Sequence, residues 1–243
     1  MADRVCKVYK WSFRFLRGFV HKQHIILDKK DRTSLLKFSS LHNKFLEIYL
    51  LNKRLALSTR IKFFKEALIN LKTLGTVTPS SRFLSKRMLR EIDFSKADVI
   101  VELGPGNGAI TKYILEKLAP NSKLICFEIN DNFYGQLKDR NHPQLIVLNI
   151  SAEKIADELK RLKINKVNYI ISSLPLTIIP DDISDEILEK SFNVLEDNGT
   201  FIQYQYSLSY FKKLKAVFKE SISLEFEPLN IPPAFIYRCK KGI

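Results

Sequence analysis

Apolar runs of strand length alternate with segments of helical periodicity over the C-terminal two thirds of the chain. The runs lie at 98–103, 123–128, 144–149, 167–172, 200–206, 222–226 and 234–238, and helical patterns fill the gaps at about 109–119, 131–139, 152–163, 182–195 and 207–218. Repetition of strand, helix and strand in this order predicts an α/β fold with a doubly wound, seven-stranded sheet. No clear helix separates the last two runs, which predicts an antiparallel hairpin at the edge of the sheet.

The first third of the chain has a different pattern. It contains no glycine between Phe19 and Gly75 and no proline before Pro79, which predicts helices joined by short polar turns. We expect these helices at about Arg4–Val20, Ser34–Leu57 and Thr59–Leu71. The first has an aromatic-rich apolar face opposite a basic face. That pattern suits a helix lying in a membrane interface and equally a helix packed on its own domain.

Charge separates the two regions more sharply. The whole chain has a net charge of +14, and residues 1–72 contain 17 Lys or Arg against 5 Asp or Glu, a net charge of +12. Residues 73–243 therefore carry only +2. We predict a basic helical extension over 1–72 and an α/β domain over 73–243. So uneven a distribution points to a polyanionic partner at the extension, either nucleic acid or an anionic membrane surface.

The cysteines and histidines predict no metal site. Three cysteines lie far apart and no C-x-x-C pair occurs, which argues against a disulfide framework and against a zinc site. His21 and His24 have a spacing that two metal ligands can use, but no acidic or cysteine partner stands nearby. With no run of 18 apolar residues and no secretory signal pattern, we expect a cytoplasmic protein.

A glycine-rich loop follows the first predicted strand. Its sequence at 102–108 is ELGPGNG, and such glycines let the backbone turn sharply and approach a ligand closely. The helix that follows offers amide donors to an anionic or polar group. Glu128 ends the next strand, where a carboxylate can accept hydrogen bonds from both hydroxyls of a ribose. The spacing Gly104-x-Gly106-x-x-Ala109 also fits the nucleotide fingerprint of dehydrogenases.

Three details together resemble the S-adenosylmethionine motif of class I methyltransferases. The third glycine comes two residues after the second, an acid stands two residues before the first, and a second acid, Glu128, ends the next strand. The resemblance implies a Rossmann-like sheet and S-adenosylmethionine as the cofactor. It implies cofactor binding by Ser81, Glu102, Gly104, Gly106, Asn107, Gly108, Glu128, Ile129, Ser151, Ala152 and Ser172. Ser151 stands where these enzymes often place an acid that meets the adenine amino group.

The fourth predicted strand ends in ISSLPL at 171–176. In amino-group methyltransferases this position usually reads Asn/Asp-Pro-Pro-Tyr and holds the acceptor nitrogen in line with the methyl group. The present sequence keeps the turn without the Asn and the Tyr, so an adenine would miss an aromatic platform that an aliphatic amine does not need. The catalytic candidates are Ser173, Leu174 and Tyr206, since a phenol can relay a proton from an ammonium. Tyr206 is favoured over Tyr204, and one of the two is expected to pack in the core.

Four segments together resemble the bacterial phospholipid N-methyltransferases: 63–68 (FFKEAL), 75–84 (GTVTPSSRFL), 173–176 (SLPL) and 230–237 (NIPPAFIY). The resemblance implies an enzyme that methylates phosphatidylethanolamine stepwise towards phosphatidylcholine. The partners it implies are a phospholipid substrate and an anionic surface at the inner face of the membrane, where each basic residue contributes about 1 kcal/mol. An ornithine lipid is a related acceptor, and the sequence leaves open the preferred lipid, the number of methyl groups added and the role of residues 1–55.

Two other functions compete with lipid methylation. Residues 81–84 (SRFL) also resemble a Gln-Asn-Phe-Leu segment of rRNA adenine dimethylases, and a +12 extension can bind phosphates. The missing aromatic after Pro175 and the lack of the expected C-terminal helical domain argue against this rival, so nucleic acid is not the expected partner. A lipid-binding protein without catalysis is the third alternative, for which Ser151 is the only hint.

Overall fold

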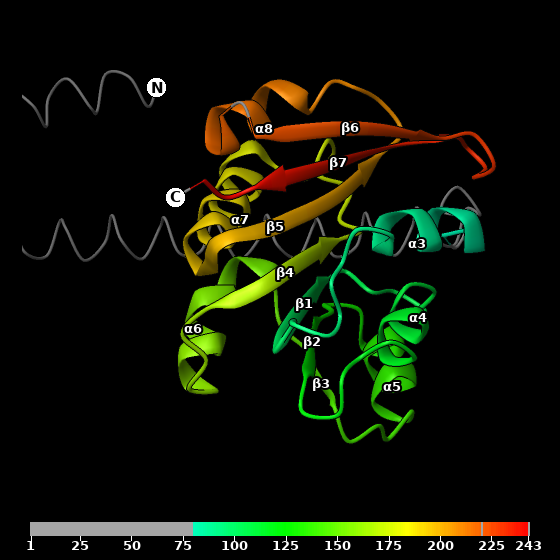
Figure 1. Ribbon diagram of the computed structural model, residues 1–243, viewed down its shortest axis with the longest axis vertical. Helices are drawn as coiled ribbons and strands as arrows, with labels where there is room; N and C mark the ends of the chain where they lie inside the picture. Colours follow the sequence, from blue (N-terminus) through cyan, green and yellow to red (C-terminus); the bar gives the residue numbers. More distant parts are fainter. Residues whose placement is uncertain (1–79, 220, 243) are drawn as a thin grey trace, which may run out of the picture. The chain divides into compact units, whose positions relative to one another are not determined.

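One mixed sheet organises residues 80–219 and 221–242, the part of the chain that this computed structural model describes. Its strands run in the order β3-β2-β1-β4-β5-β7-β6 (Figure 1). Their bounds are β1 Val99–Leu103, β2 Lys123–Phe127, β3 Leu145–Leu148, β4 Val167–Ser172, β5 Leu195–Gln205, β6 Ile222–Glu227 and β7 Ala234–Lys240. Strands β1 to β5 pair in parallel, and β7 is antiparallel to both β5 and β6. The predicted seven-stranded, doubly wound sheet with a closing hairpin is confirmed.

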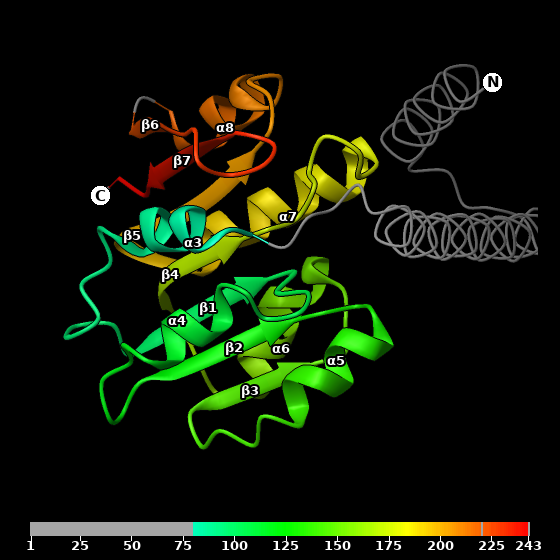
Figure 2. The same cartoon turned by 90° about the vertical axis from the view of Figure 1, so that its right-hand side faces the viewer.

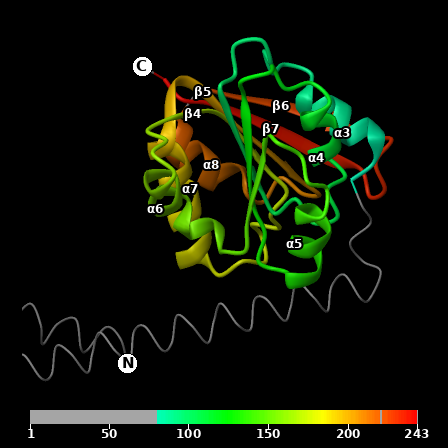
Figure 3. The same ribbon diagram turned by 90° about the horizontal axis from the view of Figure 1, so that it is seen from below.

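Helices cover both faces of this sheet (Figure 3). On one face lie α3 (Arg82–Leu89), α4 (Thr111–Leu115) and α5 (Asp131–Lys138), and on the other α6 (Ile155–Arg161), α7 (Asp181–Val194) and α8 (Phe211–Phe218). A 3-10 turn, η1 (Ala152–Lys154), leads into α6. Strands that are covered on both faces need apolar side chains at nearly every position. Ile100, Val101 and Leu103 of β1 are accordingly all fully buried.

Helix α3 is absent from the elements that the periodicity predicts. Its buried Leu84 and Met88 face the sheet, and α3 packs on β5 and β6 (Figure 2), but several basic residues interrupt the apolar spacing. Ser81 caps the first turn, because its hydroxyl accepts a hydrogen bond from the Leu84 amide at 3.2 Å. At the other end, Arg238 of β7 donates to the Met88 carbonyl at 2.9 Å and also to the carbonyl before it.

Ion pairs fasten α3 to the hairpin of β6 and β7. Nε of Arg87 lies 2.6 Å from Oε2 of Glu227, and Nη2 of Arg90 lies 3.0 Å from Oε2 of Glu225. The buried Arg238 donates from Nε to Oε1 of Glu225 at 2.8 Å. Removal of one partner of a buried ion pair leaves an uncompensated charge, so this cluster holds α3 firmly on the sheet.

Two boundaries differ from the prediction. Strand β5 begins at Leu195, within the segment whose spacing predicts the end of a helix, and Asn198 has a φ of +65° inside it. Helix α8 begins at Phe211, because a bend at 206–208 and a turn at 209–210 come before it, and the hydroxyls of Ser207 and Ser209 lie 2.8 Å apart there. The extension 1–72 and its three predicted helices lie outside the described residues, so the division at residue 72 stays a prediction.

Candidate functional site

The carboxyl ends of β1 and β4 lie side by side near the middle of the sheet. Leu103 is paired with Ser172 there, and the chain leaves β1 for α4 on one face but leaves β4 for α7 on the other. In open α/β sheets, ligands bind outside the carboxyl ends of the strands at such a switch point. Both loops that the sequence predicts to be functional, 104–108 and 173–176, begin at this place.

The glycine loop has the backbone that its sequence predicts. Gly104, Gly106 and Gly108 have φ values of +69°, +58° and +77°, in the region that side chains rarely allow. A Cβ at Gly104 would lie 2.7 Å from Cδ2 of Leu174, so the cofactor loop and the acceptor loop approach each other at this glycine. A side chain here would fill the cradle that a cofactor needs, which is one observation that fits S-adenosylmethionine.

An arginine from a distant segment supports the same loop. Nη2 of Arg140 donates to the carbonyls of Asn107 at 3.1 Å and Gly108 at 3.4 Å. The Asn107 side chain is exposed and accepts from the Ala109 amide at 3.2 Å. Arg140 is not among the residues predicted from the sequence. It follows a helix and lies more than thirty positions after the loop, so local spacing gives no sign that the two meet.

Glu128 lies against the glycine loop, as a ribose-binding carboxylate would. Its buried carboxylate accepts hydrogen bonds from the amide of Gly106 at 2.9 Å and from the amide of Asn130 at 2.8 Å. Asn130 in turn caps α5, and Ile129 between them is half-buried. The structure therefore brings together two predicted cofactor contacts that are 22 positions apart. The ribose role of Glu128 itself stays a prediction.

Glu102 points into the core behind the loop. Its Oε2 accepts a hydrogen bond from Oγ1 of Thr111 at 2.7 Å and contacts Sγ of Cys126 at 3.6 Å, so it anchors the start of α4. Complete burial raises the pKa of this carboxyl to about 7. Its Oε1 is buried without a hydrogen-bond partner in the described part of the chain, and this is the atom left for a ligand or a water. Whether Glu102 touches the cofactor stays a prediction.

Ser151 and Ala152 follow β3 at the same edge of the sheet. Ala152 is buried and begins η1, whereas Ser151 precedes it, is half-buried and makes no capping hydrogen bond with its side chain. The hydroxyl is thus not used by the helix, which leaves it available for the predicted adenine contact.

The acceptor loop after β4 is tied to β1 and β5. The Ser173 amide donates to the Leu103 carbonyl at 2.9 Å, and the hydroxyl of the buried Ser172 accepts from the Leu174 amide at 3.4 Å. The carbonyl of Leu174 accepts from Nε2 of Gln203 at 3.0 Å and from Nε2 of Gln205 at 3.3 Å. It also accepts from the Leu176 amide at 2.8 Å, so β5 and the loop itself together use the acceptor capacity of this carbonyl.

Neither glutamine is among the site residues predicted from the sequence. Gln203 is fully buried and Gln205 nearly so, in a strand covered on both faces. The signal was present, because two amide side chains within an otherwise apolar and aromatic strand need buried partners. Those partners belong to another loop, and local spacing does not name them.

The two tyrosines at the end of β5 differ in exposure. Tyr204 is 9% exposed and Tyr206 is 40% exposed, with ring centroids 5.8 Å apart in an edge arrangement. Ser80 donates its hydroxyl to Oη of Tyr204 at 3.5 Å. Burial raises the pKa of Tyr204 well above its usual value, so this phenol stays neutral. Tyr204 is thus the tyrosine packed in the core, and the phenol of Tyr206 lies at the surface.

Two segments that carry the family resemblance contact each other. The Ser81 amide donates to Oδ1 of Asn230 at 3.0 Å, and Nδ2 of Asn230 donates to the Pro232 carbonyl at 2.7 Å. The Ser81 hydroxyl already accepts the capping bond of α3, so its predicted cofactor contact would use its O–H as a donor. The described part of the first motif, residues 80–84, thus contacts the motif 230–237 through a hydrogen bond of Asn230 that serves the structure.

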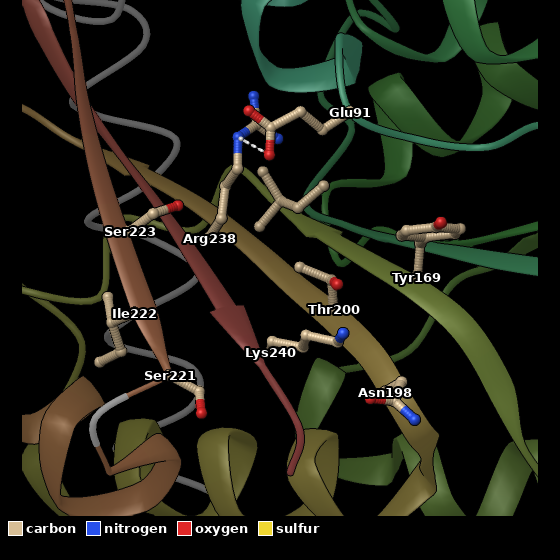
Figure 4. Close-up of a pocket in the computed structure, with 10 residues that line it drawn as sticks. Glu91, Tyr169, Asn198, Thr200, Ser221, Ile222, Ser223, Arg238 and Lys240 are labelled. Carbon is tan, nitrogen blue, oxygen red and sulfur yellow. Dashed lines mark ion pairs between the residues drawn. The ribbon is translucent and has the colours of Figure 1, made fainter.

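A separate groove of about 550 Å³ lies on the α3 face, towards the amino ends of β4 and β5 (Figure 4). Tyr169, Thr200 and Lys240 project from three neighbouring strands, and Arg238 forms an ion pair with Glu91 at one end. None of the predicted site residues lines this groove, so it is distinct from the cofactor site.

Three features define a class I S-adenosylmethionine-dependent methyltransferase. They are the order of the strands, the glycine loop with its positive φ values, and the Glu128 carboxylate beside that loop. A family profile described as ribosomal RNA adenine dimethylase matches residues 78–213, more than half of the chain, and the protein belongs to this family. It is an S-adenosylmethionine-dependent N-methyltransferase.

The relatives differ in how much of their length is matched. An ornithine lipid N-methyltransferase of Singulisphaera acidiphila is 29% identical over 181 residues, which make up 74% of this chain and 92% of that enzyme. The ribosomal RNA small subunit methyltransferase A of Mycoplasma capricolum is 31% identical over 112 residues, or 46% of this chain and 40% of that enzyme.

A solved structure described as an S-adenosylmethionine-dependent methyltransferase from Listeria monocytogenes has the same fold. It superposes with a TM-score of 0.50 at 16% identity and covers 65% of this chain and 98% of that one. No helix within residues 80–219 and 221–242 is long and apolar enough to cross a membrane.

Proposed function

We propose that the enzyme methylates the head-group amine of a membrane amino lipid, with an ornithine lipid as the first candidate and phosphatidylethanolamine as the second. The observation that carries the proposal is the extent of the match, 92% of an ornithine lipid N-methyltransferase against 40% of an rRNA methyltransferase. The enzyme would act at the inner face of the membrane, where the +12 extension over 1–72 is attracted to anionic lipids.

The acceptor loop supports an aliphatic amine. Leu176 stands where amino-group methyltransferases usually have an aromatic ring, and it is 1% exposed. Stacking on an aromatic side chain contributes about 1–3 kcal/mol per base in nucleic-acid binders, and residues 173–176 offer a base no such surface. An aliphatic amine needs hydrogen-bond acceptors and an in-line approach instead.

S-adenosylmethionine supplies an electrophilic methyl group on a positively charged sulfur. An acceptor amine would need a free nitrogen lone pair to receive this methyl group, so its ammonium form would first have to lose a proton. Among the described residues the Ser173 hydroxyl makes no hydrogen bond, whereas the Leu174 carbonyl accepts three. We propose that this hydroxyl accepts a hydrogen bond from the amine. For Tyr206, which is 40% exposed at the end of β5, we propose that the phenol relays this proton.

The test is methyl transfer from labelled S-adenosylmethionine to vesicles that contain either an ornithine lipid or phosphatidylethanolamine, with total RNA as the rival acceptor. We expect label in the lipid fraction, and mass analysis then gives the number of methyl groups added. Label in RNA alone would refute the proposal and favour adenine methylation, the alternative that the family profile supports. Cofactor binding without label in either fraction would refute the proposal and point to a different amine acceptor.

A pair of variants in the acceptor loop tests the site. Ser173→Ala should lower kcat for the lipid amine by roughly tenfold or more while the affinity for S-adenosylhomocysteine stays unchanged. Thr177→Ala is the matched control, since this exposed hydroxyl lies four positions further along the same loop. Equal activity of the two variants would remove Ser173 from the acceptor site.

A further inference from the structure

Three loops without charge border the acceptor site. They are residues 173–180 after β4, 206–210 after β5 and 228–233 between β6 and β7, and we call them the edge loops. Their nineteen residues include no Asp, Glu, Lys or Arg, whereas the chain average of 27% would give about five. Because β4, β5 and β6 all point the same way, these loops lie at one edge of the sheet (Figure 1).

Large apolar side chains project from the edge loops into solvent. Ile231 is 78% exposed, Leu229 59%, Ile178 51% and Leu208 48%. Phe83 at the start of α3, also exposed, belongs to the same region, because Ser81 of its cap is bonded to Asn230 of the third edge loop. An exposed group of this kind, next to a predicted active site, marks a surface that binds a partner.

Hydrogen bonds fasten two of the edge loops to strands of the sheet. The first is bonded to the end of β5 through the Leu174 carbonyl, and the second to β7 through Oη of Tyr237, which donates to the Ser207 carbonyl at 3.1 Å. The backbone that carries these apolar side chains is therefore bonded to the sheet, next to the predicted acceptor site.

The charges beside the edge loops suit an anionic partner. Arg82, Lys86 and Lys212 are exposed and have no ion-pair partner among the residues that the structure describes. Of the nearby acids, Asp181 is paired with Lys213 at 2.8 Å. An uncharged apolar edge with unpaired cations beside it matches the interface of an anionic bilayer, where apolar groups are buried and basic groups meet phosphates.

We infer that the edge loops insert into the surface of the lipid bilayer and so bring the head-group amine to the methyl donor. This inference rests on the proposed lipid function and assigns to the catalytic domain a membrane contact of its own, separate from the basic extension. An RNA partner fits this surface poorly, because phosphate contacts require basic side chains that the edge loops lack.

The test compares two full-length variants in binding to vesicles of phosphatidylethanolamine and anionic lipid. Leu229→Asp with Ile231→Asp should weaken binding by roughly tenfold or more. Leu224→Asp is the control, because Leu224 is 45% exposed on β6 but lies outside the edge loops. Binding is measured by sedimentation in about 0.5 M salt, which screens the attraction of the basic extension and leaves apolar insertion.

Insertion can also be followed directly with a reporter that does not depend on loss of binding. The chain has one tryptophan, Trp11, so the pair Trp11→Phe and Ile231→Trp places a single reporter in the third edge loop. We expect a blue shift with vesicles and quenching by lipids brominated on their acyl chains. Absence of both signals would overturn the inference. Unchanged vesicle binding by the Leu229→Asp, Ile231→Asp variant would overturn it as well.

Methyl transfer is recorded separately so that the two proposals can fail separately. Lipid methylation that is unaffected by the Asp variant would leave the proposed function intact and refute insertion. Vesicle binding that depends on the edge loops, without any lipid methylation, would refute the proposed function but support insertion of these loops into the bilayer. If light scattering shows dimers of the wild-type chain that the Leu229→Asp, Ile231→Asp variant lacks, and vesicle binding is the same for both, the edge loops bind a second copy of the chain and the inference is refuted.

Discussion

Replacement of Gly104 by alanine measures how closely the cofactor loop approaches the acceptor loop. Gly104 has a φ of +69°, and a left-handed backbone costs a residue with a Cβ about 1–2 kcal/mol. The new Cβ would also lie 2.7 Å from Cδ2 and 3.4 Å from Cγ of Leu174, and overpacking of this kind costs about 1–3 kcal/mol. We expect a total loss of about 2–5 kcal/mol in the free energy of unfolding.

A double-mutant cycle separates the two contributions. Leu174→Ala removes the atoms that clash, so in this background Gly104→Ala should cost only the backbone part, about 1–2 kcal/mol. The coupling energy should therefore be about 1–3 kcal/mol. Urea denaturation gives the four stabilities, and calorimetric titration with S-adenosylhomocysteine shows whether the cradle is also lost.

Gly135 provides the control. It lies within α5, and a Cβ there would meet nothing within 4 Å, so Gly135→Ala should stabilise the protein by about 0.5–1 kcal/mol. If Gly104→Ala costs the same in the wild-type background and in the Leu174→Ala background, the two loops do not touch, and the site built on their contact is wrong.

Three further perturbations test the buried Glu102, the bonds of Arg238 to the end of α3 and to Glu225 (the α3 clamp), and the acceptor site. Burial raises the pKa of Glu102 to about 7 from 4.5, so the folded state binds a proton that the unfolded state releases, and stability should fall by about 3 kcal/mol as pH rises through this window. Glu102→Gln should abolish that slope in thermal melts between about pH 4.5 and 8, and an unchanged slope would contradict the assignment. Arg238→Met removes the donors to the last carbonyls of α3 and one partner of Glu225, and should cost about 3 kcal/mol in urea denaturation; a loss under about 1 kcal/mol would contradict the clamp. Tyr206→Phe should lower kcat by about a hundredfold without changing cofactor affinity, whereas Tyr204→Phe should change stability instead; the reverse pattern in steady-state kinetics would exchange their roles.

Local sequence patterns are enough to predict the sheet, because strands buried on both faces must be apolar throughout. All seven runs became strands, and β4 has the predicted bounds. Helix α3 could not be predicted in this way, since its basic residues serve partners on β6 and break the apolar periodicity. The start of β5 at Leu195 was missed because the apolar residues 194 and 195 continue the spacing of α7.

The cofactor loop could likewise be predicted, because its glycines and the acid after β2 are local features at strand ends. The partners that fix the acceptor loop could not. Gln203 lies 29 positions from the Leu174 carbonyl that it binds, and Arg140 lies 33 positions from Asn107. Such contacts depend on which strands become neighbours, and that order follows from the whole fold.

The limits of the family match indicate where acceptor preference is determined. Lipid amines and adenine both present a nitrogen to the same methyl donor, so the transfer itself needs the same glycine loop and the same carboxyl ends of β1 and β4. The profile covers these parts and ends at residue 213, before β6, β7 and the third edge loop. Leu229 and Ile231, among the most exposed apolar side chains described, lie in the part that the profile does not cover. If delivery of the acceptor distinguishes lipid from RNA enzymes on this scaffold, replacement of Leu229 and Ile231 by lysine, with Asn230 kept on Ser81, should reduce lipid methylation while cofactor binding stays intact.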